Sequence, residues 1–184
     1  MDNHIKDSEQ KMKASIDHLH VELGKVRTGR ASVALVEDIK IDYYGNTTPL
    51  AQAATLGVPD SKTITIAPWD SSLIPVIEKA IQSSDLGLTP SNDGKAIRLT
   101  IPPLTTDRRQ QLTKVVKKYG EDCKIAIRNI RRDFNDKLKA MEKDHSISKD
   151  DERKGHEVIQ KATDKYVAEV DKIVQGKEKD VLEG

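Results

Sequence analysis

Residues 105–141 read TTDRRQQLTKVVKKYGEDCKIAIRNIRRDFNDKLKAM, and this stretch decides the fold. An apolar side chain recurs every three or four positions, which is typical of one face of an α-helix. Thr105 and Asp107 supply a hydroxyl cap and an early acid, and so predict the helix start. At a rise of about 1.5 Å per residue, this helix is about 50–60 Å long. Its apolar seam comprises Leu112, Val116, Tyr119, Cys123, Ile127, Ile130, Phe134, Leu138 and Met141.

The stretches before and after it have the same helical period. Gly29 lies near the expected end of the first helix, where a left-handed cap would fit, while Ser148 and Asp151 resemble a capping arrangement that opens the last one. A helix with one apolar stripe is not stable alone in water, so we expect an elongated antiparallel three-helix bundle. The first seam is Ile5, Met12, Ile16, Leu19, Leu23 and Val26; the last is Ile159, Ala162, Tyr166, Val170, Ile173 and Val181.

All seven prolines lie between residues 49 and 103, which excludes long helices there. Apolar residues alternate instead, around a turn at residues 44–46 and a short helix over residues 72–83. We therefore expect a small α+β unit whose helix covers one face of its sheet, and an α+β fold in two domains. The alternating strand residues are Ile39, Ile41, Tyr43, Ile64, Ile66, Ile97, Leu99 and Ile101.

The proline-rich region interrupts the helical one, so the small domain is inserted into the bundle. We predict a bundle of residues 1–29 and 105–184 and an insert of residues 31–103, joined near residues 30–32 and 102–104. Two short parallel connections often act as a hinge. A rigidly docked insert is equally compatible with the sequence, because interface residues are not visible in it.

Composition places the chain among amphipathic helical proteins. One-third of the residues are charged, 3% are aromatic, and the net charge is only +1. That charge is uneven, since residues 105–141 hold eleven basic and five acidic side chains. The nearly neutral total charge argues against indiscriminate polyanion binding, so any polyanion contact is expected in this basic region.

The basic side chains of the long helix gather beside its seam. At about 100° per residue from Cys123, the side chains of Lys117, Lys124, Arg128 and Arg131 fall between about 80° and 140°, and they span about 21 Å of helix. Arg132 lies further round. Arginine forks grip phosphates, which favours nucleic acid; a solvated flank paired with acids of adjacent helices is the alternative. Residues 124–132 contain no acid that could provide local pairing.

No motif predicts catalysis, a metal site or a cofactor. Cys123 is the only cysteine, and it lies on an apolar seam, where thiols are structural. His18 and His20 are two positions apart on a helix and face different directions. The polar start is unlike a signal peptide, and no apolar run approaches a membrane span. We expect a cytoplasmic, monomeric protein that is not an enzyme.

Several short stretches together resemble the bacterial ribosome recycling factor family. The resemblance runs in order from about residue 5 to the C-terminus, and it is weaker over residues 46–80 and the last helix. The matching motifs are residues 26–32 (VRTGRAS), 42–45 (DYYG), 84–90 (SDLGLTP), 97–98 (IR), 101–105 (IPPLT) and 127–133 (IRNIRRD).

This resemblance implies an L-shaped translation factor with a long three-helix bundle and an inserted compact β/α/β domain. With elongation factor G and GTP, such a factor splits the post-termination ribosome into subunits for a new round of initiation. Its bundle would contact 23S ribosomal RNA of the large subunit. The residues that this assigns to RNA are Arg30, Arg128, Arg131 and Arg132, beside the flank residues Lys117 and Lys124; those assigned to the hinge are Arg30, Ala31, Ser32, Pro102, Pro103 and Leu104.

Two other classes of function remain compatible with the residues themselves. A helical chaperone or adaptor would use exposed apolar patches and show weak salt dependence. An enzyme would need a cleft with perturbed titrating groups in the small domain.

Overall fold

The computed structural model describes residues 2–184, which form two compact units. The helical unit runs to Leu23 and resumes from Gln111 to Asp180. The small unit comprises residues 24–110 and 181–184. It therefore includes the first residues of one long helix and the last residues of another. Arg109 joins these two helix ends, because its Nη1 donates a hydrogen bond to the Val181 carbonyl (2.6 Å).

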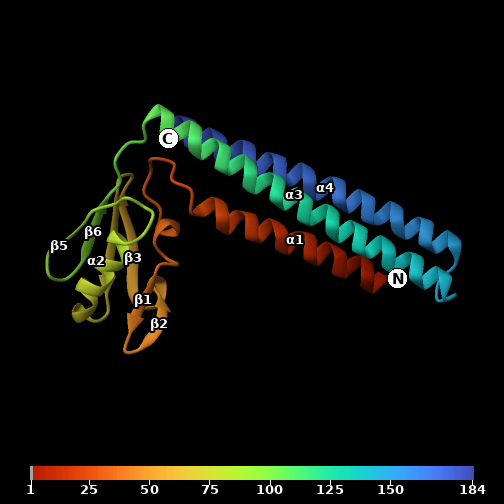
Figure 1. Cartoon of the computed structure of the whole chain (residues 1–184), viewed down its shortest axis with the longest axis horizontal. Helices are drawn as coiled ribbons and strands as arrows, with labels where there is room; N and C mark the ends of the chain where they lie inside the picture. The colour runs from red at the N-terminus through yellow and green to blue at the C-terminus, as the bar shows by residue number, and fades with distance from the viewer. Residues whose placement is uncertain (1) are drawn as a thin grey trace. The chain divides into compact units, whose positions relative to one another are not determined.

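Three long helices lie side by side in the helical unit: α1 (Asp2–Gly24), α3 (Thr106–Lys143) and α4 (Lys149–Glu183). α3 runs antiparallel to the other two (Figure 1). The mixed helix-and-sheet class predicted from the sequence is confirmed. The expected seams supply the buried side chains, among them Met12, Ile16, Leu19, Leu23, Leu112, Val116, Cys123, Ile127, Phe134, Leu138, Ile159, Ala162 and Val170.

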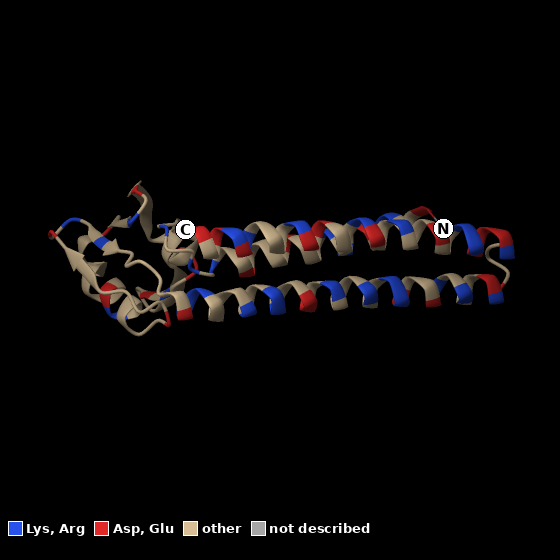
Figure 2. Cartoon of the chain, turned by 90° about the horizontal axis from the view of Figure 1, so that it is seen from above, with Lys and Arg blue, Asp and Glu red and all other residues tan. Residues whose placement is uncertain are grey.

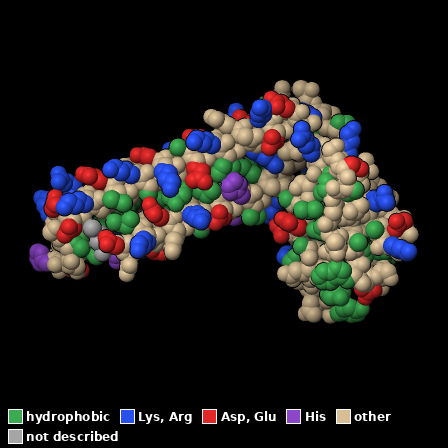
Figure 3. Space-filling view, turned by 180° about the vertical axis from the view of Figure 1, so that it is seen from behind, with side chains coloured by type: hydrophobic (Ala, Val, Ile, Leu, Met, Phe, Trp, Pro, Cys, Tyr) green, Lys and Arg blue, Asp and Glu red, His purple; other side chains and the backbone are tan. Residues whose placement is uncertain are grey.

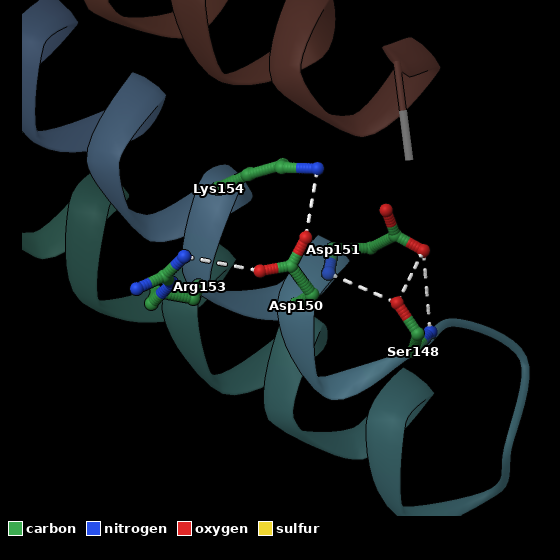
Figure 4. A network of polar contacts seen from close by, with 5 residues as sticks. All are labelled: Ser148, Asp150, Asp151, Arg153 and Lys154. Carbon is green, nitrogen blue, oxygen red and sulfur yellow. Dashed lines mark hydrogen bonds and ion pairs between the residues drawn. The ribbon is translucent and has the colours of Figure 1, made fainter.

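The caps that the sequence predicts begin α3 and α4. Thr105 Oγ1 accepts a hydrogen bond from the Arg108 amide (3.2 Å). At the start of α4, the Asp151 amide donates to Ser148 Oγ (3.1 Å), and the Ser148 hydroxyl and amide both donate to Asp151 Oδ2 (2.7 and 3.4 Å; Figure 4). Amides that lack a partner inside the helix are thereby satisfied.

Asp150 adds a second set of contacts to the first turn of α4. Its carboxylate accepts from Lys154 (2.8 Å) and Arg153 (3.1 Å), as Figure 4 shows. The Lys154 contact lowers the pKa of Asp150, and the Ser148 hydroxyl lowers the pKa of Asp151. Both carboxylates therefore stabilise the fold above their ordinary pKa, and this contribution disappears as the pH falls through their lowered values.

Two helical glycines permit close packing between α3 and α4. A Cβ atom on Gly120 would lie 2.5 Å from Val174 Cγ2, and one on Gly155 would lie 2.7 Å from Leu138 Cδ1. Both positions are buried. Gly176 differs, because a Cβ atom there would meet nothing within 4 Å. The first two glycines thus have a packing reason, which the sequence alone does not reveal.

The predicted end of the first helix is wrong. α1 ends at Gly24, and Gly29 lies outside it with a φ of 84°. Val26 is buried without being helical. The reason is tertiary: the Arg27 guanidinium donates to the carbonyls of Leu86 (3.3 Å) and Pro102 (3.2 Å), which draws the chain into the small unit.

The small unit contains a hairpin and a sheet. Strands β1 (Lys40–Tyr43) and β2 (Asn46–Pro49) form the hairpin. The antiparallel sheet has the order β3-β4-β6-β5. Its strands are β3 (Ala54–Asp60), β4 (Thr63–Pro68), β5 (Pro90–Asn92) and β6 (Ile97–Thr100). Single-turn helices span Val33–Leu35, Leu50–Gln52 and Ser71–Leu73.

Helix α2 (Ile74–Gln82) provides the core partner of the sheet. Alternating residues of β4 and β6 are buried, and α2 buries Ile77 and Ile81 completely. The expected strands around Ile64 and Ile97, the turn at residues 44–46 and the short helix are thus present. Strands β2, β3 and β5 were not predicted, because they are polar, interrupted by Gly57 and Pro59, or only three residues long.

The glycine contacts predict opposite effects of one substitution. Gly176→Ala is expected to raise the free energy of unfolding by up to about 1 kcal/mol, because alanine favours an open helix position. Gly155→Ala is expected to lower it by about 1–2 kcal/mol, since overpacking against buried Leu138 outweighs the gain in propensity. Urea denaturation of the two variants and the wild type measures this. Equal stabilisation by both would contradict the packing role of Gly155.

Candidate nucleic-acid interface

The predicted basic flank and Arg132 lie on α3 within the helical unit, and these five residues divide into two groups. Lys117, Arg128 and Arg132 are exposed, whereas Lys124 and Arg131 are half-buried. Seam burial explains the division, because the helical period turns positions 124 and 131 closer to the packed face. Figure 2 shows Lys and Arg recurring along the long helices with acidic residues between them.

Lys124 is held by two carboxylates. Its Nζ lies 2.5 Å from Asp171 Oδ1 on α4 and 3.1 Å from Glu121 Oε1 one turn earlier on α3. The Lys124 side chain is 16% exposed, and the hydrogen bond to Asp171 is the main cause that raises its pKa. Lys124 therefore follows the alternative in which a flank cation pairs with acids of an adjacent helix, and it links α3 to α4.

Arg131 also reaches across to α4. Its Nη1 donates to Gln160 Oε1 (3.1 Å), and Gln160 Nε2 in turn donates to Asp164 Oδ1 (2.8 Å). This chain of hydrogen bonds orients the guanidinium along the α3–α4 interface. One edge of Arg131 is thus used inside the protein.

The remaining three cations face solvent. Within residues 2–184, the side chains of Lys117, Arg128 and Arg132 make no hydrogen bond or ion pair. They span about 22 Å along α3 at the helical rise. An exposed row of this kind can bind phosphates without breaking any contact of the fold.

The other predicted RNA residue, Arg30, lies in the small unit with the predicted hinge residues. Arg30 and Pro103 are exposed. The Ala31 amide donates to the Ser61 carbonyl (2.8 Å), and Ser32 Oγ accepts from the Ala34 amide (3.3 Å). On the second connection, the Leu104 carbonyl accepts from Arg109 Nε (3.4 Å).

Cys123 lines a groove of about 480 Å³ between α1 and α3, together with Ala14, His18, Leu19 and Tyr119. The thiol donates to the Ser15 carbonyl (3.4 Å), and burial raises its pKa, which disfavours the reactive thiolate. Across residues 2–184, no group of three His, Cys, Asp or Glu side chains is placed to hold a metal ion. None of the helices described is long and apolar enough to span a membrane.

Comparisons with known proteins agree with one another. The family model for ribosome recycling factor matches residues 19–182. The ribosome-recycling factors of Oleidesulfovibrio alaskensis and Legionella pneumophila are 52% and 51% identical over 183 and 184 residues, and each alignment covers 100% of both chains.

Solved structures match over nearly the whole chain as well. A solution structure of ribosome recycling factor superimposes with a TM-score of 0.77 at 38% identity, covering 100% of this chain and 97% of the other. The second is the Thermus thermophilus factor, described as a model together with Escherichia coli elongation factor G bound to the E. coli post-termination complex. It gives a TM-score of 0.68 at 41% identity and covers 98% of each chain.

The fold and its exposed basic row define a class: a helix-and-sheet protein whose long bundle presents cations on one helix and whose second unit is a small sheet domain. The chain belongs to the ribosome recycling factor family. Members of that family are translation factors and not enzymes. The resemblance inferred from short motifs is thus confirmed over the full length.

The sequence patterns do not predict two features of the surface. Asp171, the partner of Lys124, is 47 positions away on α4 and carries no local signal. Tyr44 and Trp69 are strongly exposed aromatic residues of the small unit. The sequence placed Tyr44 in a turn and assigned it no role.

The Lys124–Asp171 pair predicts a small, salt-sensitive and pH-sensitive coupling. A double-mutant cycle with Lys124→Met and Asp171→Asn is expected to give about 0.2–1 kcal/mol, because Asp171 is half exposed to screening solvent. Because folding raises the pKa of Lys124, the coupling is present below the ordinary lysine pKa and disappears as the pH rises through the raised value. Thermal melts of the four proteins at neutral and strongly alkaline pH measure it; a pH-independent coupling would contradict the assignment.

Proposed function

We propose that this chain binds the post-termination ribosome and, with elongation factor G and GTP, dissociates it into subunits. The family and the relative described on a post-termination complex support this proposal. The proposed contact surface rests on one observation, the exposed row of Lys117, Arg128 and Arg132. We assign this row to 23S ribosomal RNA of the large subunit.

The chemistry of the row favours phosphate. Arginine forks bind phosphate oxygens bidentately, and Arg128 and Arg132 lie one helical turn apart. The aromatic rings of α3 are not available for base stacking, since Phe134 is buried and Tyr119 half-buried. Recognition would therefore use the RNA backbone and shape and not the base sequence.

Lys124 and Arg131 enter the proposal with smaller roles. Lys124 would have to leave two carboxylates to bind a phosphate, whereas Arg131 keeps donors beyond the one that binds Gln160. Arg30 is exposed in the small unit and adds a cation near the predicted connections. We rank Arg128 and Arg132 first, then Arg131, Lys117 and Arg30, and Lys124 last.

The two connections supply the movement. We propose that residues 30–32 and 102–104 form a hinge between the predicted domains, residues 1–29 with 105–184 and residues 31–103. The stiff bundle would act as a lever anchored on RNA, while the GTPase partner supplies the energy. The factor would act as a monomer in the cytoplasm, where ribosomes are found.

The RNA contact predicts that charge reversal on the row weakens ribosome binding. The double variant Arg128→Glu/Arg132→Glu is expected to bind 70S ribosomes at least ten-fold more weakly. Its affinity should also depend less on salt, by about 0.7–0.9 log units per decade for each phosphate that the variant no longer binds. Co-sedimentation at several salt concentrations measures both quantities.

The matched control is Lys161→Glu/Lys172→Glu, which makes the same charge change at exposed positions of α4. It is expected to bind like the wild type, and circular dichroism melts of both variants should match. A similar drop in affinity in the control, or unchanged binding by the α3 variant, would count against a specific RNA row.

The hinge predicts that a reversible lock separates binding from splitting. In a Cys123→Ala background, a cysteine pair with one partner in each predicted domain, and thus on either side of the hinge, is compared in its oxidised and reduced forms. The oxidised form is expected to bind ribosomes normally but to split them at least ten-fold more slowly, since movement of the small domain is blocked. Subunit separation followed by light scattering gives the rate. Equal rates in both forms would remove the hinge from the mechanism.

A further inference from the structure

Two large aromatic side chains of the small unit are left in solvent. Tyr44, in the β1–β2 turn, is 77% exposed, and Trp69, directly after β4, is 67% exposed. Figure 3 shows hydrophobic side chains gathered at the end of the small domain where the hairpin lies. Exposed aromatic groups of this size are enriched at interaction surfaces and give the fold little.

Hydrogen bonds fix both rings in place. The Tyr44 hydroxyl donates to Asp70 Oδ2 (2.6 Å), and Trp69 Nε1 donates to Thr55 Oγ1 (3.2 Å). The Tyr43 ring lies 4.9 Å from that of Tyr44 and restricts it further. Their polar atoms are thus satisfied within the chain, and the apolar ring faces remain for a partner. Little side-chain freedom is left to lose on binding.

The backbone conformation at Tyr44 also indicates a role in recognition. Its φ is 50°, in the left-handed region, and Gly45 follows at 81°. Turns of this kind favour Asn followed by Gly, and a tyrosine there costs of order 1 kcal/mol. Its exposed ring returns no core packing. A residue that strains its own turn and packs against no core is expected to serve recognition.

Charge distinguishes between protein and RNA as the partner. Asp70 follows Trp69 in the chain, and its carboxylate accepts from the Tyr44 hydroxyl. Asp42, in strand β1, accepts from the Gly45 amide of the turn. The Tyr44 hydroxyl is the main cause that lowers the pKa of Asp70, which therefore stays ionised. Residues 31–103 hold eight acidic and five basic side chains. The predicted small domain therefore has an excess of acidic side chains, which disfavours contact with RNA phosphates.

We propose that Tyr44, Asp70 and the adjoining Trp69 form a docking site for a lysine- and arginine-rich protein segment of the post-termination complex. Cationic side chains would lie over the ring faces and pair with Asp70 and Asp42. The proposal rests on the proposed function for the location of the partner. It gives the factor two contact surfaces of opposite charge, the basic row of α3 and this acidic aromatic site.

Photocrosslinking in the full-length factor tests the site directly. The photoreactive residue p-benzoylphenylalanine is placed at position 44, 69 or 58, and each protein is irradiated on purified post-termination ribosomes with and without elongation factor G. Val58 is the control, because it is 41% exposed at the other end of β3 from the Trp69 side. Crosslinks from 44 and 69 to lysine- and arginine-rich peptides of a protein are expected. Crosslinks mainly to ribosomal RNA, to an acidic segment, or no more than from position 58 would overturn the proposal.

Activity supplies a second test that a folding defect cannot imitate. Tyr44→Asn relieves the left-handed strain, so its melting temperature is expected to equal or exceed that of the wild type. Tyr44→Asn and Trp69→Ala are each expected to slow subunit splitting at least ten-fold, as removal of an aromatic anchor does. Val58→Ala should split at the wild-type rate. Rates within two-fold of wild type for both variants would overturn the site.

The two proposals fail in distinguishable ways. If the wild-type chain itself does not split ribosomes, the proposed function is wrong, while crosslinking, which needs only binding, still decides the site. If the wild type splits ribosomes and the aromatic variants do so equally well, only the docking site is wrong.

Discussion

The rest of the structure depends on the mutual burial of three apolar seams. The bundle helices are 23, 38 and 35 residues long, and each has a single apolar stripe that water would not tolerate in isolation. Burying the stripes fixes the rotation of every helix about its axis, and one position of error would turn each side chain by about 100°. The orientation of α3 therefore decides which of its cations reach solvent. The basic row of Lys117, Arg128 and Arg132 is a consequence of what packs on the opposite side.

The interface between α3 and α4 shows why a basic stretch is not the same as a basic surface. Gly120 and Gly155 bring the two helices close. At that distance Lys124 reaches Asp171 and Arg131 reaches Gln160. Two of the five predicted RNA-binding cations of α3 are thereby used to hold helices together, and three remain for a ligand. A count of charge in residues 105–141 cannot separate these groups, because the partners come from another helix.

The sequence predicts what local patterns encode and misses what distant contacts decide. Period and caps located α3 and α4, because Thr105, Ser148 and Asp151 act within one turn of themselves. The end of α1 was placed too late, since Arg27 binds carbonyls 59 and 75 positions away. Strand β5 consists of three polar or proline residues with no apolar alternation. It is recognised as a strand through its pairing with β6. Motif resemblance supplied the family, which no physical pattern in the chain could give.

A residue that does not suit the backbone conformation of its own position indicates a function more clearly than a residue that suits it. Residues 44–46 were expected to turn, and they do, yet the first of them is a tyrosine in a conformation that suits asparagine or glycine. The seams show the opposite case, where every local choice serves the bundle and none indicates a ligand. The strained turn, the exposed rings and the Asp70 carboxylate that binds Tyr44 all belong to the small unit. A basic helix row suits a polyanion and an acidic aromatic site suits a cationic protein, so a factor with both can contact RNA and protein within one ribosome without the two surfaces competing for the same ligand.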